Sequence, residues 1–146
     1  MREDTVLMPG PGLDKDAIVE ALVAAAARAH GLGDPESLLA RVREREQGIS
    51  TTLDSGLSLP HARLDGIERV VAALAVLPHG VIDPKQPSPK MRAIFLFFSP
   101  NRQEAFAQHL QVLRGVSALF QPTLIEELCR FKTPAQIVAR IRAAGA

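Results

Sequence analysis

The stretch MRAIFLFF, residues 91–98, decides the fold class that the sequence predicts. It is a nearly continuous apolar run, and the polar turn Ser99-Pro100-Asn101 follows it. A short apolar run bounded by turn residues is typical of a strand buried on both faces. We therefore expect residues 91–98 to form the central strand of a sheet.

Extended segments are also expected upstream of this run. Residues 69–77 are rich in β-branched side chains and predict a second strand. Residues 78–90 contain four prolines and predict a long connection, with at most a short strand at residues 80–83. From Gly56, apolar and polar residues alternate in short extended segments.

Helical periodicity flanks the strands on both sides. Asp14 and Asp34-Pro35 are expected to begin two helices, which end near Gly31 and Gln47. Three more helices are predicted over residues 103–120, from Pro122, and from the N-cap pair Thr133-Pro134. The predicted order is two helices, then several strands, then three helices. This order favours a single α/β domain over residues 1–146, with a mixed β-sheet flanked by helices.

Composition narrows the function. Seventeen basic residues against sixteen acidic ones give a net charge of +1, so we expect no nucleic-acid partner. The single cysteine, Cys129, excludes an internal disulfide and a cysteine-rich zinc site. The N-terminus lacks the apolar core of a signal peptide, and the apolar runs are too short to span a bilayer. We expect a cytoplasmic protein that does not insert into the membrane.

Among the four histidines, His61 is the strongest candidate for chemistry. The φ angle of Pro60 is fixed by its ring, which stiffens the backbone before His61, and hydroxyl-bearing residues upstream can donate to an oxyanion. A helix end and a turn are sufficient to explain His30 and His79. His109 faces the buried stripe of its helix, so it is either a core-edge histidine or a second imidazole facing His61.

The segment REQGIST, residues 45–51, followed by Leu59-Pro60-His61, resembles the active-site region of the mannitol/fructose-type enzyme IIA domains. These domains belong to the bacterial phosphoenolpyruvate-dependent sugar phosphotransferase system. The segment QHLQVL, residues 108–113, matches their second histidine, which stands in a His-Leu-x-x-Leu context. The resemblance covers roughly residues 15–145. A chain without attached transporter modules is most similar to the stand-alone nitrogen-regulatory branch.

The resemblance implies an α/β sandwich and a phosphotransferase role. His61 would accept a phosphoryl group from a phosphorylated HPr-type protein, for regulation rather than dedicated sugar uptake. Arg45 would stabilise charge on the phosphoryl oxygens, and His109 would contact the transferred group or orient the donor. Thr51, with Ser50, would hold the free nitrogen of His61 or bind a phosphoryl oxygen. The mechanism needs no metal or small cofactor, and an enzyme IIB or regulatory targets would act downstream.

Several alternatives stay open on the sequence. The chain could be a binding module that keeps the fold without being phosphorylated, or a sugar-specific IIA component. A metal site would need His61, His109 and a carboxylate such as Asp54. Thr52 and Asp54 also occupy loop positions where the family commonly has glycine, and an aspartate there adds negative charge near a phosphohistidine. Cys129 lies on a predicted helix and is not expected to be the cysteine of an enzyme IIB.

Overall fold

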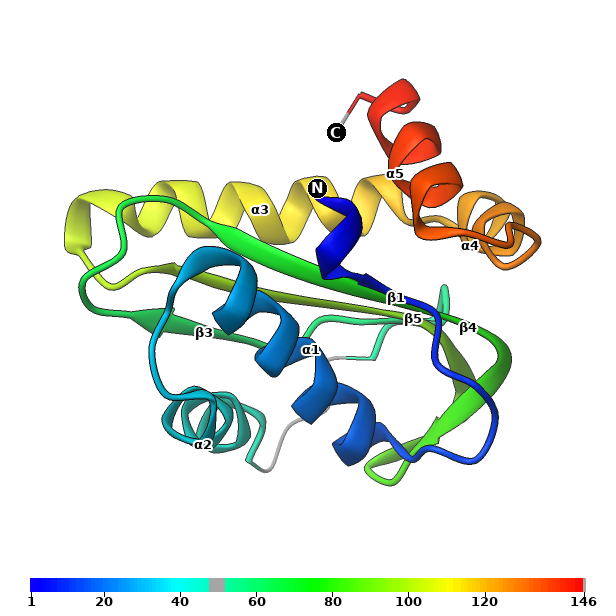
Figure 1. The fold of residues 1–146 in the computed structure, drawn as a ribbon, viewed down its shortest axis with the longest axis horizontal. Helices are drawn as coiled ribbons and strands as arrows, with labels where there is room; N and C mark the ends of the chain where they lie inside the picture. The colour runs from blue at the N-terminus through cyan, green and yellow to red at the C-terminus, as the bar shows by residue number, and fades with distance from the viewer. Residues whose placement is uncertain (48–51, 146) are drawn as a thin grey trace.

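The fold is a mixed five-stranded sheet with helices on both faces, as expected (Figure 1). The computed structural model describes residues 1–47 and 52–145. The strands are β1 (Val6–Leu7), β2 (Leu57–Ser58), β3 (His61–Leu64), β4 (Val71–Asp83) and β5 (Gln86–Pro100). The helices are α1 (Lys15–His30), α2 (Pro35–Glu46), α3 (Phe106–Leu119), α4 (Pro122–Leu128) and α5 (Pro134–Ala143), with 3-10 turns η1 (Glu3–Thr5) and η2 (Gln103–Ala105).

Strand β5 is the central strand that the run at residues 91–98 predicts. It pairs antiparallel with β4 on one side, and parallel with β2 and then β3 on the other. Strand β1 completes the sheet by pairing parallel with β4. The side chains of Ile94 and Leu96 are fully buried. The register of β3 on β5 places His61 beside Phe97.

Residues 78–90 are not the long connection that their prolines predict. Strand β4 continues to Asp83 and β5 starts at Gln86, so this segment forms the distal part of a long hairpin. The β4–β5 register shifts on either side of the Val81–Met91 pair. Proline is tolerated where a ladder is bulged or where a strand has no neighbour on one side. Strand β2 pairs with β5 only from Ala93 onward, so the part of β5 that holds prolines of this segment does not pair with β2.

The helix boundaries follow the capping residues that the sequence indicates. Asp14 accepts a hydrogen bond from the Ala17 amide, and Asp34 accepts one from the Glu36 amide. Thr133 forms a capping box with Gln136 at the start of α5. Gly31 ends α1 in the left-handed conformation that glycine favours, with a φ of 62°.

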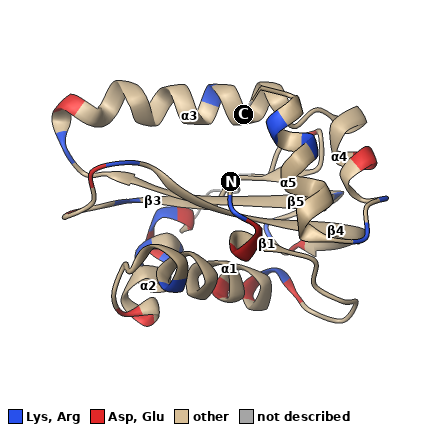
Figure 2. Cartoon of the chain, turned by 45° about the horizontal axis from the view of Figure 1, so that its top comes forward, with Lys and Arg blue, Asp and Glu red and all other residues tan. Residues whose placement is uncertain are grey.

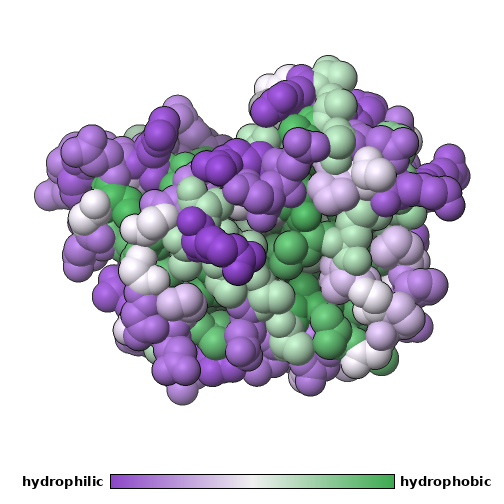
Figure 3. All heavy atoms as spheres, viewed as in Figure 1, coloured by the Kyte–Doolittle hydropathy of each residue, from purple (hydrophilic) through white to green (hydrophobic). Residues whose placement is uncertain are grey.

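The helices divide between the two faces of the sheet. Helices α1 and α2 cover one side, here called the α1/α2 face, and α3, α4 and α5 cover the other, here called the α3 face (Figure 1). Each side has its own core cluster, with Leu22, Leu96 and Phe98 on the α1/α2 face and Phe97, Leu128 and Ile137 on the α3 face. In the same view as Figure 1, hydrophilic residues cover most of the periphery, and hydrophobic residues are visible near the middle of the molecule (Figure 3).

Helix α3 packs differently from its predicted stripe. The side chain of His109 is the buried one in this helix, and Val112, Leu113 and Val116 continue its inward side as half-buried residues. Phe106 and Leu110, whose helical spacing with Leu113 and Val116 predicts burial, are 48% and 37% exposed. The helix contains one charged residue, Arg114 (Figure 2). No helix within the described residues is long and apolar enough to cross a membrane.

Candidate functional site

The site is built around His61, the first residue of β3. The imidazole is 4% exposed and stacks on Phe97, its neighbour across the sheet, with ring centroids 5.0 Å apart and planes within 7°. Strand residues alternate between faces, so Pro60 and Ala62 face α1 and α2 while His61 faces α3. The strand therefore holds the ring on the α3 face in one orientation.

A backbone hydrogen bond defines the protonation of the His61 ring. Nδ1 lies 2.7 Å from the carbonyl oxygen of Leu59. Because a carbonyl can only accept, Nδ1 bears the hydrogen and Nε2 bears the lone pair. Nε2 is buried and has no hydrogen-bond partner among the residues that the structure describes. A buried acceptor without a partner is uncommon, which makes Nε2 of His61 a candidate for binding a ligand group.

His109 approaches His61 from α3. The two ring centroids are 5.3 Å apart and the planes are inclined by 55°. Nδ1 of His109 is 2.5 Å from Oγ of Ser99, a buried residue near the end of β5. The ring is buried and makes a hydrogen bond to Ser99, as a core-edge histidine would, and it also faces His61, so the geometry is compatible with both interpretations left open by the sequence. Ser99, which was not singled out from the sequence, is the residue that holds its ring.

Burial and nearby cations lower the pKa of both imidazoles. Desolvation is the largest cause for His61, and the positive charge of Arg45 adds to it, whereas the Leu59 carbonyl and Glu46 act in the opposite direction. The pKa of His109 is lowered by burial first, then by His61, Arg63 and Arg45. Both rings are therefore mostly neutral at pH 7, the state in which a histidine nitrogen is a nucleophile.

Two arginines contribute positive charge to this region. Arg45, next to the last residue of α2, is exposed, and its charge acts on both imidazoles. Arg63, which sequence reasoning missed, lies two residues after His61 and so points to the same face of the strand. Its Nη2 donates to the carbonyls of Pro100 and Arg102, at 2.9 and 2.6 Å, and its guanidinium lies 5.4 Å from the ring centroid of Phe106. The alternation of strand residues was the signal that could have found it.

The remaining residues singled out from the sequence have different outcomes. Thr51 and Ser50 lie outside the described residues. Thr52 is buried, and its hydroxyl donates to Asp83 at 2.7 Å, so this departure from glycine has a structural partner. Asp54 is exposed. Within residues 1–47 and 52–145, no group of three histidine, cysteine or acidic residues is arranged to hold a metal ion.

Cys129 lacks the surroundings of a reactive thiol. It follows α4, is half-buried, and its Sγ lies 3.8 Å from the carbonyl oxygen of Arg92. Burial raises the pKa of the thiol, which disfavours the nucleophilic thiolate.

Comparison with known proteins relates this geometry to one family. Residues 1–144 match the family model described as "Phosphoenolpyruvate-dependent sugar phosphotransferase system, EIIA 2". The Nitrogen regulatory protein of Pseudomonas aeruginosa is 24% identical over 97% of this chain and 94% of that protein.

Solved structures share the fold. The Nitrogen Regulatory Protein IIA-Ntr of Neisseria meningitidis superposes with a TM-score of 0.81 at 21% identity, covering 96% of this chain and 94% of that one. Enzyme IIAMTL of Escherichia coli, solved in complex with phosphorylated enzyme IIBMTL, gives a TM-score of 0.77 at 14% identity, covering 98% and 97%.

Proposed function

We propose that this chain, which belongs to the EIIA 2 family of the phosphoenolpyruvate-dependent sugar phosphotransferase system, accepts a phosphoryl group on Nε2 of His61 from a phosphorylated HPr-type carrier protein. The observation that supports this most is the state of the His61 ring. Nδ1–H is fixed by the Leu59 carbonyl, and the lone pair of Nε2 is left without a partner.

The transfer balances without an added acid or base. The lone pair of Nε2 attacks phosphorus in line, a new N–P bond forms, and the N–P bond of the carrier breaks with its electron pair returning to the carrier's imidazole. The hydrogen on Nδ1 stays where it is. Phosphorylation leaves positive charge on the His61 ring, and the Leu59 carbonyl, 2.7 Å from Nδ1, stabilises that charge. Nε2 is covered in the unphosphorylated protein, so side chains around it must shift when the carrier docks.

Arg45 and His109 are assigned supporting roles in this proposal. Arg45 would place a bidentate cation against the phosphoryl oxygens, where such charges are most effective in phosphoryl transfer. His109 would donate from Nε2 to a phosphoryl oxygen, since the Ser99 hydroxyl can donate to its Nδ1. Thr51 stays in the proposed site on the family resemblance alone.

We further propose that the phosphorylation state serves regulation. Support comes from the likeness to the Pseudomonas nitrogen regulatory protein over nearly the full length of both chains. In the sugar-transport alternative, the group would move onward to an enzyme IIB protein, the kind of partner present in the enzyme IIAMTL complex. In the third alternative, the chain binds partners without being phosphorylated.

The test is labelling in a reconstituted system. The chain is incubated with phosphoenolpyruvate, enzyme I and an HPr-type protein, and intact mass is recorded. We expect the mass of one phosphoryl group, labile to acid, in wild type and in the distant control His79→Gln, but not in His61→Gln. Label that persists in His61→Gln would contradict the assigned acceptor. An unlabelled wild type would favour the binding module, and passage of label to an added enzyme IIB would favour the transport branch.

A further inference from the structure

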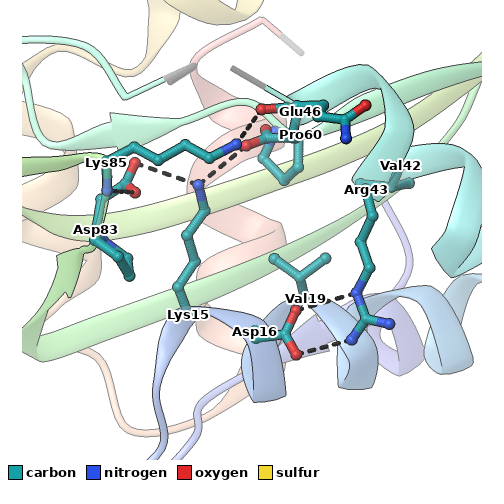
Figure 4. A pocket seen from close by; sticks show the side chains of 11 residues that line it. Lys15, Asp16, Val19, Val42, Arg43, Glu46, Pro60, Asp83 and Lys85 are labelled. Carbon is teal, nitrogen blue, oxygen red and sulfur yellow. Dashed lines mark hydrogen bonds and ion pairs between the residues drawn. The ribbon is translucent and has the colours of Figure 1, made fainter. Parts of the chain in front are cut away.

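A buried cluster of charges lies on the α1/α2 face, beside Pro60, the residue that precedes His61 (Figure 4). Lys15 of α1 extends its Nζ to Oε2 of Glu46 at 3.1 Å and to Oδ2 of Asp83 at 3.2 Å. Lys85, from the hairpin turn, donates through its Nζ to the main-chain carbonyl of Glu46. The Thr52 hydroxyl donates to the same carboxylate of Asp83. The cluster therefore joins the start of α1, the end of α2, the tip of the β4–β5 hairpin and the residue that pairs with Ser58 of β2.

The cluster borders a pocket of about 320 Å³ that Pro60 also lines. Pro60 and His61 are adjacent on the chain and face opposite sides of the sheet, so the cluster and the imidazole are separated by the backbone of β3. The Asp83 side chain is fully buried, and those of Lys15 and Glu46 are about 10% exposed. These charges are largely withdrawn from water.

A buried ion pair of this kind is a poor source of folding stability. Removing charged groups from water costs several kcal/mol each, and the attraction between them only roughly offsets that cost. What such a cluster does supply is a fixed geometry, because each member loses its partner if the elements move apart. Glu46, the last residue of α2, is held twice here. Lys15 donates to its side chain and Lys85 donates to its main-chain carbonyl.

We propose that Lys15, Asp83 and Lys85 are positioning residues that hold the C-terminal end of α2, and with it Arg45, against the phosphoryl site of His61. The proposal rests on the proposed phosphoryl transfer. Arg45 directly precedes Glu46 and is itself exposed, so its direction is set by the turn that the cluster holds. The charges of Arg45 and Glu46 both act on the His61 ring, which shows that this turn lies within electrostatic reach of the imidazole.

A second ion pair in the same pocket supplies the matched control. Arg43 and Asp16 also connect α2 to α1, with Nη2 and Oδ2 2.8 Å apart, but their side chains are 52% and 64% exposed. Neither residue contacts Glu46 or the hairpin in the hydrogen bonds and ion pairs of the described residues. Loss of this pair should leave the end of α2 in place.

The experiment measures single-turnover transfer from a phosphorylated HPr-type carrier over a range of carrier concentrations. We expect Lys15→Met to lower the maximal rate about 10–100-fold, as misplacement of a positioning group does, with little change in the half-saturating concentration. Lys15→Arg should restore part of the maximal rate. Arg43→Met should transfer at the wild-type rate. A merely destabilised fold would instead lower the labelled fraction without splitting the two constants.

Lys85→Met provides the second variant, because this exposed residue is less critical for folding. Its maximal rate should fall several-fold even if Lys15→Met lacks a cooperative thermal transition. Wild-type labelling that is lost in His61→Gln, together with unchanged maximal rates in Lys15→Met or, where that variant does not fold, in Lys85→Met, would overturn the positioning role and leave the proposed function standing. An unlabelled wild type would overturn both.

Discussion

The two sides of the sheet at Pro60 and His61 hold their charged and titratable side chains in different ways. On the α1/α2 face, the buried charges of Lys15 and Asp83 lie within ion-pair distance of each other. On the α3 face, the imidazole of His61 keeps one nitrogen buried without a partner, and the helix above it has a single charged residue. The first arrangement fixes geometry, and the second leaves an unsatisfied group.

This difference shows where a ligand is expected. An unpaired buried polar group costs about 1–3 kcal/mol. In the proposed function, a phosphoryl group bound to Nε2 of His61 would give this nitrogen a partner. In the proposed function, the chemistry lies on the α3 face and the support for it on the α1/α2 face, where Arg45 precedes the last residue of α2.

Removal of Arg45 should have the largest effect on transfer. Arg45→Ala deletes the cation proposed to stabilise the phosphoryl oxygens, and loss of one such group typically lowers the rate about 10²–10³-fold. Its side chain is exposed, so the free energy of unfolding should hardly change. Single-turnover labelling and urea denaturation measure the two quantities. Equal rates in Arg45→Ala and in the control Arg43→Ala would contradict the role of Arg45 in phosphoryl transfer.

Acid should slow transfer, and the midpoint should lie below the ordinary histidine pKa of 6.5. The neutral imidazole is the nucleophile, and burial with Arg45 lowers the pKa of His61, so half of the sites are still neutral at a pH below 6.5. Further below its pKa, the rate should fall about tenfold per pH unit. Glu46, His109 and Arg63 complete the charged and titratable groups around the two rings.

The donor's own titration is removed from this measurement by comparing variants. Because the Arg45 charge lowers the pKa of His61, Arg45→Gln should move the acid limb of the profile to higher pH with the same carrier. An unmoved limb would contradict the electrostatic effect of Arg45 on His61.

The same pKa shifts act on stability. Well above pH 6.5 the folded and unfolded chains both keep His61 and His109 neutral, so these groups contribute nothing to the pH dependence there. As the pH falls below 6.5, the unfolded chain binds protons first, and unfolding becomes easier until the folded pKa values are passed. Urea midpoints of wild type and His109→Gln across this range should show a smaller acid loss in the variant.

Truncation of Ser99 should have a moderate effect. Ser99→Ala removes the hydroxyl that lies 2.5 Å from Nδ1 of His109, and one hydrogen bond of this kind is worth about 0.5–1.5 kcal/mol. The rate should fall about 2–10-fold, and a conservative Ser99→Thr should recover part of it. A variant as fast as wild type would mean that His109 does not need to be oriented for transfer.

Much of the fold was predictable because its signals are local. The cap residues Asp14, Asp34 and Thr133 define helix starts through hydrogen bonds two or three residues away, and the apolar run at residues 91–98 needs burial on both faces wherever it lies. The strands at residues 78–90 were not predicted, because the four prolines argue against a regular strand. Proline is compatible with a strand whose hydrogen-bond ladder is irregular. Its irregular register depends on pairing across the hairpin, which no local pattern contains.

The candidate site was predictable only in part. His61 was marked by Pro60 and by the family resemblance, and the approach of His109 depends on packing between segments far apart in sequence. Ser99 and Arg63 were not predicted, because their roles depend on contacts made in the folded chain. Ser99 contacts His109, and Arg63 donates to the carbonyls of Pro100 and Arg102. Thr52, interpreted from the sequence as a departure from glycine, donates to Asp83. The two residues are far apart in sequence, so no local pattern could predict this hydrogen bond.

The smallest effect should come from the exposed ion pair of the pocket. Asp16→Asn removes the partner of Arg43, but both side chains are more than half exposed and water replaces the lost contact. Such pairs contribute about 0–1 kcal/mol, so the urea midpoint should hardly move and should move still less in high salt. Asp83→Asn, which alters the buried cluster, should lower the midpoint more. Equal costs for the two substitutions would mean that Asp83 behaves as a solvated charge, and the contrast between the two sides of the sheet would then lose its physical basis.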